Sequence, residues 1–516
     1  MTHIKSFMRR EFWTSDLMVI GYFAVINLVL HLVAIGNYNY FRDELYYIAC
    51  SDHLTFGYVD HPPLAMLLLK IIRWVLGDSL FAIRLLPVLG SATFVFLTGL
   101  TARELGGRKL AMILAAAAAF APIGNFFTMH IYSMNFLDLL FWLACFLILI
   151  RIVKTGNPKY WLLFGLVVGL GLQNKISLLF LCFGVGVGIL LTDERKHLKS
   201  KYLWLGAGIA GLLFLPYILW NMSHGWPTLE FMHNAHVYKM AKVTPLEFLR
   251  EQILYNNPAT LLIWLVGLWF FFFNSEGKKY RLFGWMYLTI YILFTIQSAK
   301  SYYLAAAYPI LFAGGAVMWE TWLQRKRLRP LGPVLIILII LPTLVVCPIT
   351  LPILQPEAAI HLLDTLGLEA NAGENHEMGP LPQHYADMFG WEEMAAKTAK
   401  VYNTLSPEEQ KECIIYATNY GEAGAINFFG KRYGLPTAYS GHNSHFFWRP
   451  EGVSGNIIIV VGGREEDHLK SYREVTKMDS TYHKYAMPYE NGKGIFICRG
   501  IKRPLEEVWQ STKLFI

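Results

Sequence analysis

The chain has 516 residues, of which 54% are hydrophobic and only 16% charged, and its formal net charge is +8. Soluble domains carry charges on about a quarter of their residues, so this composition excludes an ordinary soluble protein and indicates a polytopic membrane protein. None of the six cysteines forms a CxxC pair, which excludes a zinc or dithiol redox motif of that type. Whether Cys413 and Cys498 pair stays open, as does the oligomeric state, and we expect no nucleic-acid partner.

Long apolar runs predict an α-helical bundle of about 11 membrane spans in residues 1–354. The first run follows Lys5, Arg9 and Arg10. We interpret it as a retained span rather than a cleaved signal peptide, because it is long and lacks an A-x-A ending. The runs lie at 16–35, 80–102, 110–128, 134–150, 160–173, 176–192, 202–222, 258–273, 282–297, 302–323 and 332–354.

Lys and Arg gather in every second loop between these runs, beginning with Arg103, Arg108 and Lys109. This bias predicts a cytoplasmic N-terminus in a multi-pass protein of the cell inner membrane. An odd number of spans then places the C-terminal tail on the outer, periplasmic side. The opposite loops, 37–80 and 223–257, are expected on the same outer side.

The tail, 355–516, changes character, because long apolar runs stop and charged residues return. Short strand-like segments alternate with helix-like ones, which predicts a soluble extracytoplasmic α/β domain. The expected strands are Cys413–Thr418, Ile457–Gly462 and Gly494–Cys498, and the expected helices are Glu422–Tyr433 and Glu465–Glu474.

The outer loop after the first run reads FRDELYYIACSDHLTFGYVDHPPL over 41–64. Asp43 and Glu44 follow the apolar run almost directly, and helical spacing would place Tyr46 and Tyr47 along the face of Asp43. Asp60-His61 then precedes two prolines. Charges at membrane level are costly and favour a functional role, whereas the alternative is an ordinary solvated loop.

Two further charged residues lie near the outer ends of predicted spans, namely Asp138 and Lys300. A carboxylate serves as a general base, and a lysine holds a phosphate as a point charge. Together they suit an amphiphilic substrate with a lipid tail and a phosphate head. The alternatives are a snorkelling helix-end residue for Asp138 and an interfacial anchor for Lys300. His224, His233 and His236 lack a carboxylate at ligand spacing, so we assign no metal.

The chain resembles the membrane glycosyltransferases of the GT-C fold, over roughly residues 16–350. It is similar to their bacterial branch, which includes relatives of protein O-mannosyltransferases and of the lipid A aminoarabinose transferase. A weaker resemblance extends to 417–448. The residues that carry it are Asp43-Glu44, the Pro62-Pro63 pair, Arg84, Asp138 and the stretch with Lys300, Tyr303 and Pro309.

The resemblance implies an inverting transferase that moves a hexosyl or pentosyl group from a polyprenyl-phosphate carrier, such as undecaprenyl phosphate, to an extracytoplasmic acceptor. That acceptor is a protein hydroxyl, a lipid or a glycan. In this interpretation Asp43 is the catalytic base and Glu44 supports it. Lys300, His61, Arg84 and Tyr303 bind the donor phosphate, and Asp138, Asp60, Tyr46 and Tyr47 contact substrate.

Two positions depart from the aminoarabinose transferase, which has an Arg where Tyr46 stands and a Lys where His61 stands. The sugar and the acceptor therefore stay open. The alternative functions are a transporter or flippase of a lipid-linked sugar and a non-catalytic assembly protein. Transporters tend to show paired, similarly interrupted halves, which the sequence lacks, and an assembly protein leaves the acidic cluster unexplained.

Overall fold

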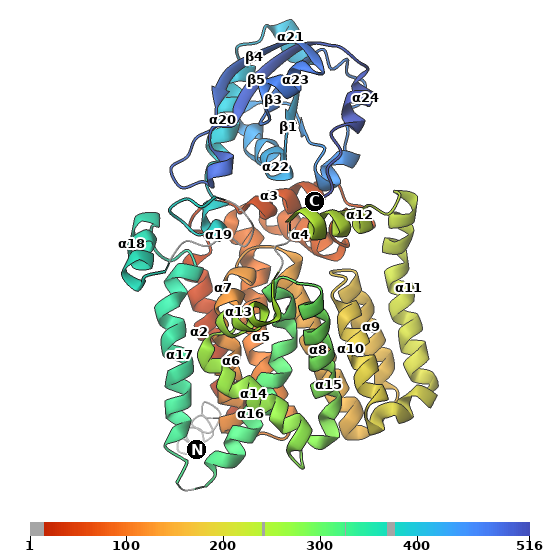
Figure 1. Ribbon diagram of the computed structural model, residues 1–516, viewed down its shortest axis with the longest axis vertical. Coiled ribbons are helices and arrows are strands. Elements are labelled where there is room, and N and C mark those ends of the chain that lie inside the picture. The colour runs from red at the N-terminus through yellow and green to blue at the C-terminus, as the bar shows by residue number, and fades with distance from the viewer. Residues whose placement is uncertain (1–14, 240–242, 326, 369–376) are drawn as a thin grey trace, which may run out of the picture. The chain divides into compact units, whose positions relative to one another are not determined.

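The computed structural model describes residues 15–239, 243–325, 327–368 and 377–516, and most of them are helical (Figure 1). Lys5, Arg9 and Arg10 lie outside these residues. The chain divides into two compact units. The first comprises Met1–Ile35, Arg84–Ile218 and Lys242–Ile353. The second comprises Gly36–Ile83, Leu219–Ala241 and Leu354–Ile516, so it joins loop 37–80 and part of loop 223–257 to the tail.

Within the described residues, six helices are long and apolar enough to cross a membrane, or seven if a pair bent by 100° is one span. The bent pair is α13 (Pro245–Tyr255) with Pro258–Phe273. Each predicted apolar run contains a helix, but several are short, so the expected count of about 11 spans stays a prediction. The six are α2 (Asp16–Ala34), α5 (Leu80–Glu104), α8 (Met134–Thr155), α11 (Lys201–Ser223), Ser301–Leu323 and α17 (Leu331–Thr350).

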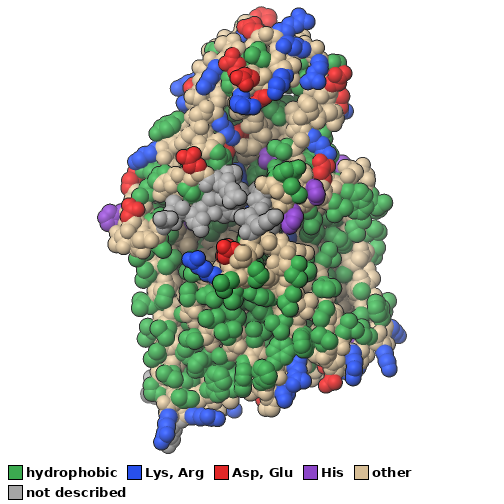
Figure 2. Space-filling model, in the orientation of Figure 1, with side chains coloured by type: hydrophobic (Ala, Val, Ile, Leu, Met, Phe, Trp, Pro, Cys, Tyr) green, Lys and Arg blue, Asp and Glu red, His purple; other side chains and the backbone are tan. Residues whose placement is uncertain are grey.

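The shorter apolar helices include α6 (Lys109–Phe120), α9 (Tyr160–Leu172) and α10 (Leu178–Leu190). The predicted run 110–128 is interrupted where α6 ends, and α7 (Ile123–Thr128) begins after Pro122, which has no N–H to continue a helix. Figure 2 shows hydrophobic side chains over the visible face of the first unit, with Lys and Arg gathered at one end of it.

Helices α14 (Leu261–Phe273) and α16 (Tyr308–Leu323) pack backbone against backbone. A Cβ added at Gly267 would lie 2.1 Å from Leu311 O, and one added at Gly315 would lie 1.9 Å from Ile263 O. Small residues permit this close approach, which is common where helices pack within a membrane. Substitution of either glycine would therefore force the two helices apart.

The tail contains a five-stranded mixed sheet in the order β2-β1-β3-β5-β4. The strand β1 (Ile414–Ala417) runs parallel to β2 (Ala438–Tyr439) and β3 (Ile457–Val461). The strand β5 (Gly494–Ile501) is antiparallel to β3 and to the edge strand β4 (Tyr472–Ser480). Three of these strands lie where the sequence predicts them.

The predicted helix Glu465–Glu474 is wrong in its second half. The helix α23 (Glu465–Leu469) is only one turn long, and β4 begins at Tyr472. Pairing with β5 decides the conformation of this polar edge strand, and local sequence does not reveal such a contact. Cys413 and Cys498 are both buried, free thiols.

Two helices of loop 37–80 position the candidate site, namely α3 (Arg42–Asp52) and α4 (Leu64–Leu76). In the tail, α20 (Trp391–Tyr402) and α22 (Tyr420–Phe429) accompany the sheet. The helix α22 packs against α3 within the second unit. The acidic loop is therefore folded against the tail rather than free.

Candidate active site

The acidic pair at the start of α3 has two different environments. Glu44 is fully buried, and its Oε2 accepts a hydrogen bond from the backbone N–H of Phe41 at 2.9 Å. It therefore caps the helix as an N3 glutamate does. The Asp43 side chain is 32% exposed, so its carboxylate is partly accessible to solvent. The two carboxylates therefore differ: Glu44 is buried and caps the helix, whereas Asp43 is partly exposed.

Asp43 is held by a tyrosine from the tail. Tyr420 Oη donates to Asp43 Oδ1 at 2.9 Å, and Arg42 Nε lies 3.5 Å from the same oxygen. Tyr420 occupies the first turn of α22, and its ring packs against that of Tyr46 with centroids 4.8 Å apart. The orientation of the carboxylate therefore depends on α22 as well as on α3.

Arg42 in turn is anchored by buried groups of the tail. Its Nη1 donates to Tyr489 Oη at 2.8 Å and lies 3.7 Å from Asp387 Oδ2. Burial raises the pKa of Asp387, and the charge of Arg42 opposes that rise. The Arg42 side chain thereby ties the start of α3 to two segments of the tail.

Tyr46 and Asp60, both predicted site residues, lie together. Tyr46 Oη donates to Asp60 Oδ1 at 2.7 Å and lies 2.9 Å from Ser444 Oγ. Burial, followed by the charge of Asp60, holds the pKa of Tyr46 well above its ordinary value. The phenol therefore stays protonated and remains a hydrogen-bond donor.

His61 is buried among tyrosines. Its ring contacts Tyr47 and Tyr58 with centroid separations of 5.3 and 4.7 Å. Its Nδ1 lies 3.0 Å from Pro62 O, and its Nε2 lies 4.0 Å from Asp60 Oδ1. The second unit thus brings Asp43, Glu44, Tyr46, Tyr47, Asp60 and His61 onto α3 and the segment that follows it.

A second cluster lies in the first unit around Asp138, on α8. This carboxylate is buried and accepts a hydrogen bond from Ser177 Oγ. Lys175 Nζ lies 3.5 Å from Asp138 Oδ2 and donates to Asn135 Oδ1 at 2.9 Å. A buried carboxylate with a paired cation is the arrangement expected where charge is retained at membrane depth.

Lys175 also faces the segment that contains Lys300. Its Nζ lies 5.7 and 5.4 Å from the ring centroids of Tyr302 and Tyr303. Asp138, Lys175 and Tyr302 line one small cavity with Asn135 and Tyr255. Lys300 is the N-cap of the 3-10 helix Ser301–Ala307, and its carbonyl accepts the N–H of Tyr303 at 3.0 Å. The predicted Asp138 and Tyr303 are therefore brought together through Lys175.

Sequence reasoning missed Lys175. The available signal was its position between two apolar runs, 160–173 and 176–192, where a lone cation is costly unless it is paired or functional.

Arg84 belongs to the first unit and is fully buried in α5, with Nη1 3.4 Å from Ile35 O. Lys300 and Tyr303 are in the same unit, whereas His61 belongs to the second. In the described part of the chain, no group of three or more His, Cys, Asp or Glu side chains is arranged to hold a metal ion.

Comparisons of sequence point to membrane glycosyltransferases. Residues 60–220 match the family model of dolichyl-phosphate-mannose-protein mannosyltransferases. The lipid A galacturonosyltransferase RgtD of Rhizobium johnstonii is 23% identical over 295 residues. That match covers 55% of this chain and 61% of the relative, so it spans less than two thirds of the relative's length.

Comparisons of structure agree on the fold. ArnT from Cupriavidus metallidurans, solved with undecaprenyl phosphate, matches with a TM-score of 0.62 at 13% identity, over 92% of this chain and 97% of ArnT. The oligosaccharyltransferase AglB from Archaeoglobus fulgidus, solved with an inhibitory peptide and a dolichol-phosphate, matches with a TM-score of 0.52 at 11% identity. That match covers 88% of this chain and 70% of AglB.

Proposed function

We propose that this chain, which has the GT-C fold of membrane glycosyltransferases, transfers a sugar from a polyprenyl-phosphate carrier to an extracytoplasmic acceptor with inversion. The observation that carries the proposal is the environment of Asp43. Its carboxylate is partly exposed, and a tyrosine holds one of its oxygens, while the adjacent Glu44 is buried as a helix cap. An oriented carboxylate that still faces outward suits a general base.

The proposed reaction is a direct displacement. The acceptor oxygen attacks the anomeric carbon as its proton passes to Asp43, and the bond from that carbon to the carrier phosphate oxygen breaks. The polyprenyl phosphate leaves with the bonding electron pair. A single displacement inverts the anomeric configuration and requires no covalent intermediate on the protein.

The leaving phosphate needs positive charge more than a proton. Lys300 and Arg84 are the predicted cations of the first unit, and we add Lys175 because its ammonium sits beside two tyrosine rings and a buried carboxylate. A cation already held in place stabilises developing charge without reorganising. Asp138 and Ser177 would keep Lys175 in position rather than touch the phosphate. His61, inside its tyrosine cage, would orient Asp60.

The comparisons support the donor class. A structure of similar fold holds undecaprenyl phosphate, another holds a dolichol-phosphate, and the matching family model is named for a dolichyl-phosphate-mannose donor. The names of the relatives differ in both sugar and acceptor. We therefore propose a lipid-linked sugar donor and leave the sugar and the acceptor to experiment.

We further propose that the tail, 355–516, lies outside the cytoplasm together with loop 37–80. The support is the alternation of basic loops and the grouping of both segments in one unit. Transfer of a sugar to an outer acceptor requires the base on that side.

The test is transfer by the purified full-length protein in liposomes. A polyprenyl-phosphate sugar with a radiolabelled sugar is supplied with lipid, glycan and peptide acceptors, and the products are analysed. We expect label on an acceptor and release of polyprenyl phosphate. Movement of the intact donor between leaflets, without cleavage, would support the flippase instead. Full transfer by Asp43→Asn would refute the assigned base.

A further inference from the structure

One turn of the tail supports both residues that contact the Asp43 carboxylate. The strands β4 and β5 are joined by residues 481–493, which we name the β4–β5 turn. Thr481 closes this turn, because its N–H donates to Lys493 O at 2.9 Å and its hydroxyl donates to Glu490 O at 2.6 Å. Two side chains of the turn, Tyr489 and Lys493, then reach the two segments that hold Asp43.

The first route runs through Tyr489 and Arg42. Tyr489 Oη accepts a hydrogen bond from Arg42 Nη1 at 2.8 Å and donates to Asp387 Oδ1 at 2.9 Å. A phenol has a single proton to donate, so this pattern fixes the direction of the Tyr489 hydroxyl. Arg42 Nε in turn lies 3.5 Å from Asp43 Oδ1. Tyr489 therefore holds the guanidinium that faces the proposed base.

The second route begins at Lys493. Its Nζ pairs with Glu422 Oε1 and lies 3.0 Å from Glu490 Oε2. Both glutamates are buried. Burial acts to lower the pKa of Lys493, but the charges of Glu422 and Glu490 outweigh burial and raise it. The ammonium therefore stays charged, and it compensates buried carboxylates that would be costly without a cation.

Glu422 is the third residue of α22 and closes the capping box of this helix. Its Oε2 accepts the N–H of Asn419 at 3.0 Å, while its own N–H donates to Asn419 Oδ1 at 2.9 Å. Asn419 Nδ2 also donates to Glu490 Oε1 at 3.3 Å. Tyr420 lies between the two capping residues in the sequence and begins α22. The position of Tyr420 is therefore set by a cap whose glutamate is held by Lys493.

We propose that Tyr489 and Lys493 are positioning residues for Asp43, the first acting through Arg42 and the second through Tyr420. The inference rests on the proposed function, in which Asp43 is the base. Both routes end on Asp43 Oδ1, and among the described residues no hydrogen bond reaches Oδ2. The acceptor proton therefore passes to Oδ2, while the β4–β5 turn keeps Oδ1 in place.

The experiment compares the kinetics of sugar transfer in liposomes at equal amounts of folded full-length protein. Tyr489→Phe removes only one hydroxyl, Lys493→Met removes the charge at similar length, and Lys493→Arg restores the charge. The matched control is Arg499→Gln, which breaks a pair with Glu409 at 2.9 Å elsewhere on β5. Tyr489→Phe decides the question if Lys493→Met does not fold.

We expect kcat to fall about 10–100-fold in Tyr489→Phe and in Lys493→Met, since small displacements of a reacting group have effects of this order. The donor concentration for half-maximal transfer should stay the same, because neither residue touches the donor. Lys493→Arg should recover part of kcat, and Arg499→Gln should match the parent. A parent-like kcat in Tyr489→Phe and Lys493→Met would overturn the proposal.

Double variants separate positioning from a general loss of stability. Lys493→Met should cost little further transfer in a Tyr420→Phe background, and Tyr489→Phe should cost little in an Arg42→Gln background, because each route is already cut. A residue that only stabilises the tail would lower kcat equally in both backgrounds, and that result would also overturn the proposal. Full transfer by Asp43→Asn would instead refute the base itself, and this inference with it.

Discussion

Tyr420 and Asp43 are separated by 377 positions in the chain, yet the phenol donates to the carboxylate at 2.9 Å. Tyr420 begins the tail helix α22, and Asp43 sits in the first turn of the loop helix α3. The proposed base is therefore oriented by a segment distant in sequence. A tyrosine hydrogen bond stabilises the ionised carboxylate and limits its rotation.

Asp43→Asn should lower sugar transfer by roughly 10²–10⁴-fold, the usual contribution of a general base, because an amide accepts no proton. Glu44→Gln should cost less in transfer, since Glu44 caps the helix and does not face outward. The measurement is the rate of labelled product formation at equal amounts of folded protein. Loss of transfer in Glu44→Gln with full transfer in Asp43→Asn would reverse the two roles.

Removal of a proposed phosphate-binding cation should weaken use of the donor. Lys175→Met and Lys300→Ala should each require more donor lipid for half-maximal transfer, and Lys300→Arg should retain part of the function because the charge remains. The readout is the initial rate over a range of donor concentrations. Lys431→Ala, in the tail, is the control. Unchanged donor dependence in either variant would remove that lysine from the site.

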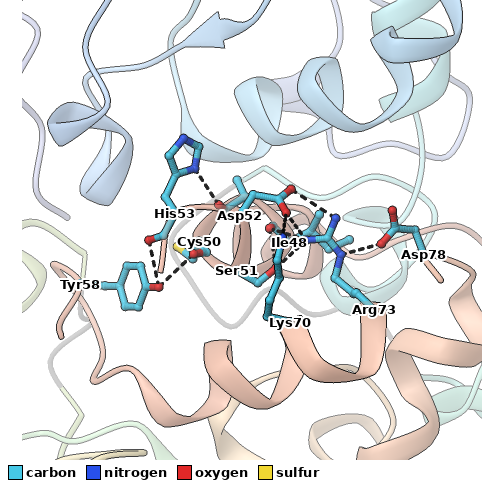
Figure 3. Close-up of polar contacts among 10 residues, drawn as sticks. Ile48, Cys50, Ser51, Asp52, His53, Tyr58, Lys70, Arg73 and Asp78 are labelled. Atoms are coloured by element: carbon cyan, nitrogen blue, oxygen red, sulfur yellow. Dashed lines mark hydrogen bonds and ion pairs between the residues drawn. The ribbon is translucent and has the colours of Figure 1, made fainter. Parts of the chain in front are cut away.

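Arg73→Gln should loosen the contact of α4 with the end of α3, where Arg73 pairs with Asp52 and Asp78 (Figure 3). The substitution removes one of the two cations paired with Asp52, the cation paired with Asp78 and the hydrogen bond to Ile48 O, a loss on the order of 1–3 kcal/mol. Hydrogen exchange of the amides of residues 48–53 should therefore accelerate. The matched control is Arg449→Gln, which breaks the exposed pair with Glu506 and should change local exchange little. Equal effects of the two variants would contradict this account.

The stability of the tail should depend on the ionisation of Glu490. Burial raises its pKa from 4.5 to about 7, which the charge of Lys493 opposes and that of Glu422 reinforces. Since the folded-state pKa is the higher one, the stabilising contribution is complete below pH 4.5 and is lost as the pH rises through 7.

Intrinsic-rate-corrected hydrogen exchange in β5, measured between those pH values, should report this loss. Glu490→Gln should flatten the dependence, because the amide is neutral throughout. Glu506→Gln, an exposed control, should leave the dependence unchanged. A flat profile in the parent protein would refute the role of Glu490.

The topology can be checked by labelling single cysteines in intact cells with a membrane-impermeant maleimide. Tyr482→Cys, in the tail, should react, whereas Lys278→Cys, in a basic loop predicted to be cytoplasmic, should react only after the membrane is opened. The native cysteines of the tail, Cys413 and Cys498, are buried and should contribute little background. The opposite labelling pattern would invert the proposed orientation.

The sequence predicts correctly those helices and strands that consist mainly of hydrophobic residues. Each expected span contains a helix, and the short β-branched segments at β1, β3 and β5 are strands. The edge strand β4 escaped prediction because its conformation depends on pairing with β5, about 20 residues further on. The helix α4 was hidden inside a segment interpreted as loop.

The sequence revealed those site residues that carry a charge beside an apolar run, where charged residues are unusual. Asp43, Asp60 and Asp138 stand out because carboxylates are rare beside apolar runs. The sequence showed only in part that Asp43 and Glu44 have different environments. Glu44 caps the helix because it is the third residue of α3, and the sequence alone does not fix where α3 begins. Lys175 also stands between two apolar runs, but its pairing with Asp138, 37 positions away, became evident only from the fold. Tyr420 carried no such signal, because its partner Asp43 lies 377 positions away.

The grouping of loop 36–83 with residues 354–516 also sets an order of events during synthesis. A ribosome makes roughly 5–20 residues per second, so Tyr420 emerges about 20–75 seconds after Asp43. Throughout that interval the carboxylate has no phenol to hold it, and Arg42 lacks Asp387 and Tyr489. A nascent or truncated chain therefore carries the acidic loop in an unassembled form. The proposed base therefore gains its partners from the tail only when the last third of the polypeptide has been made.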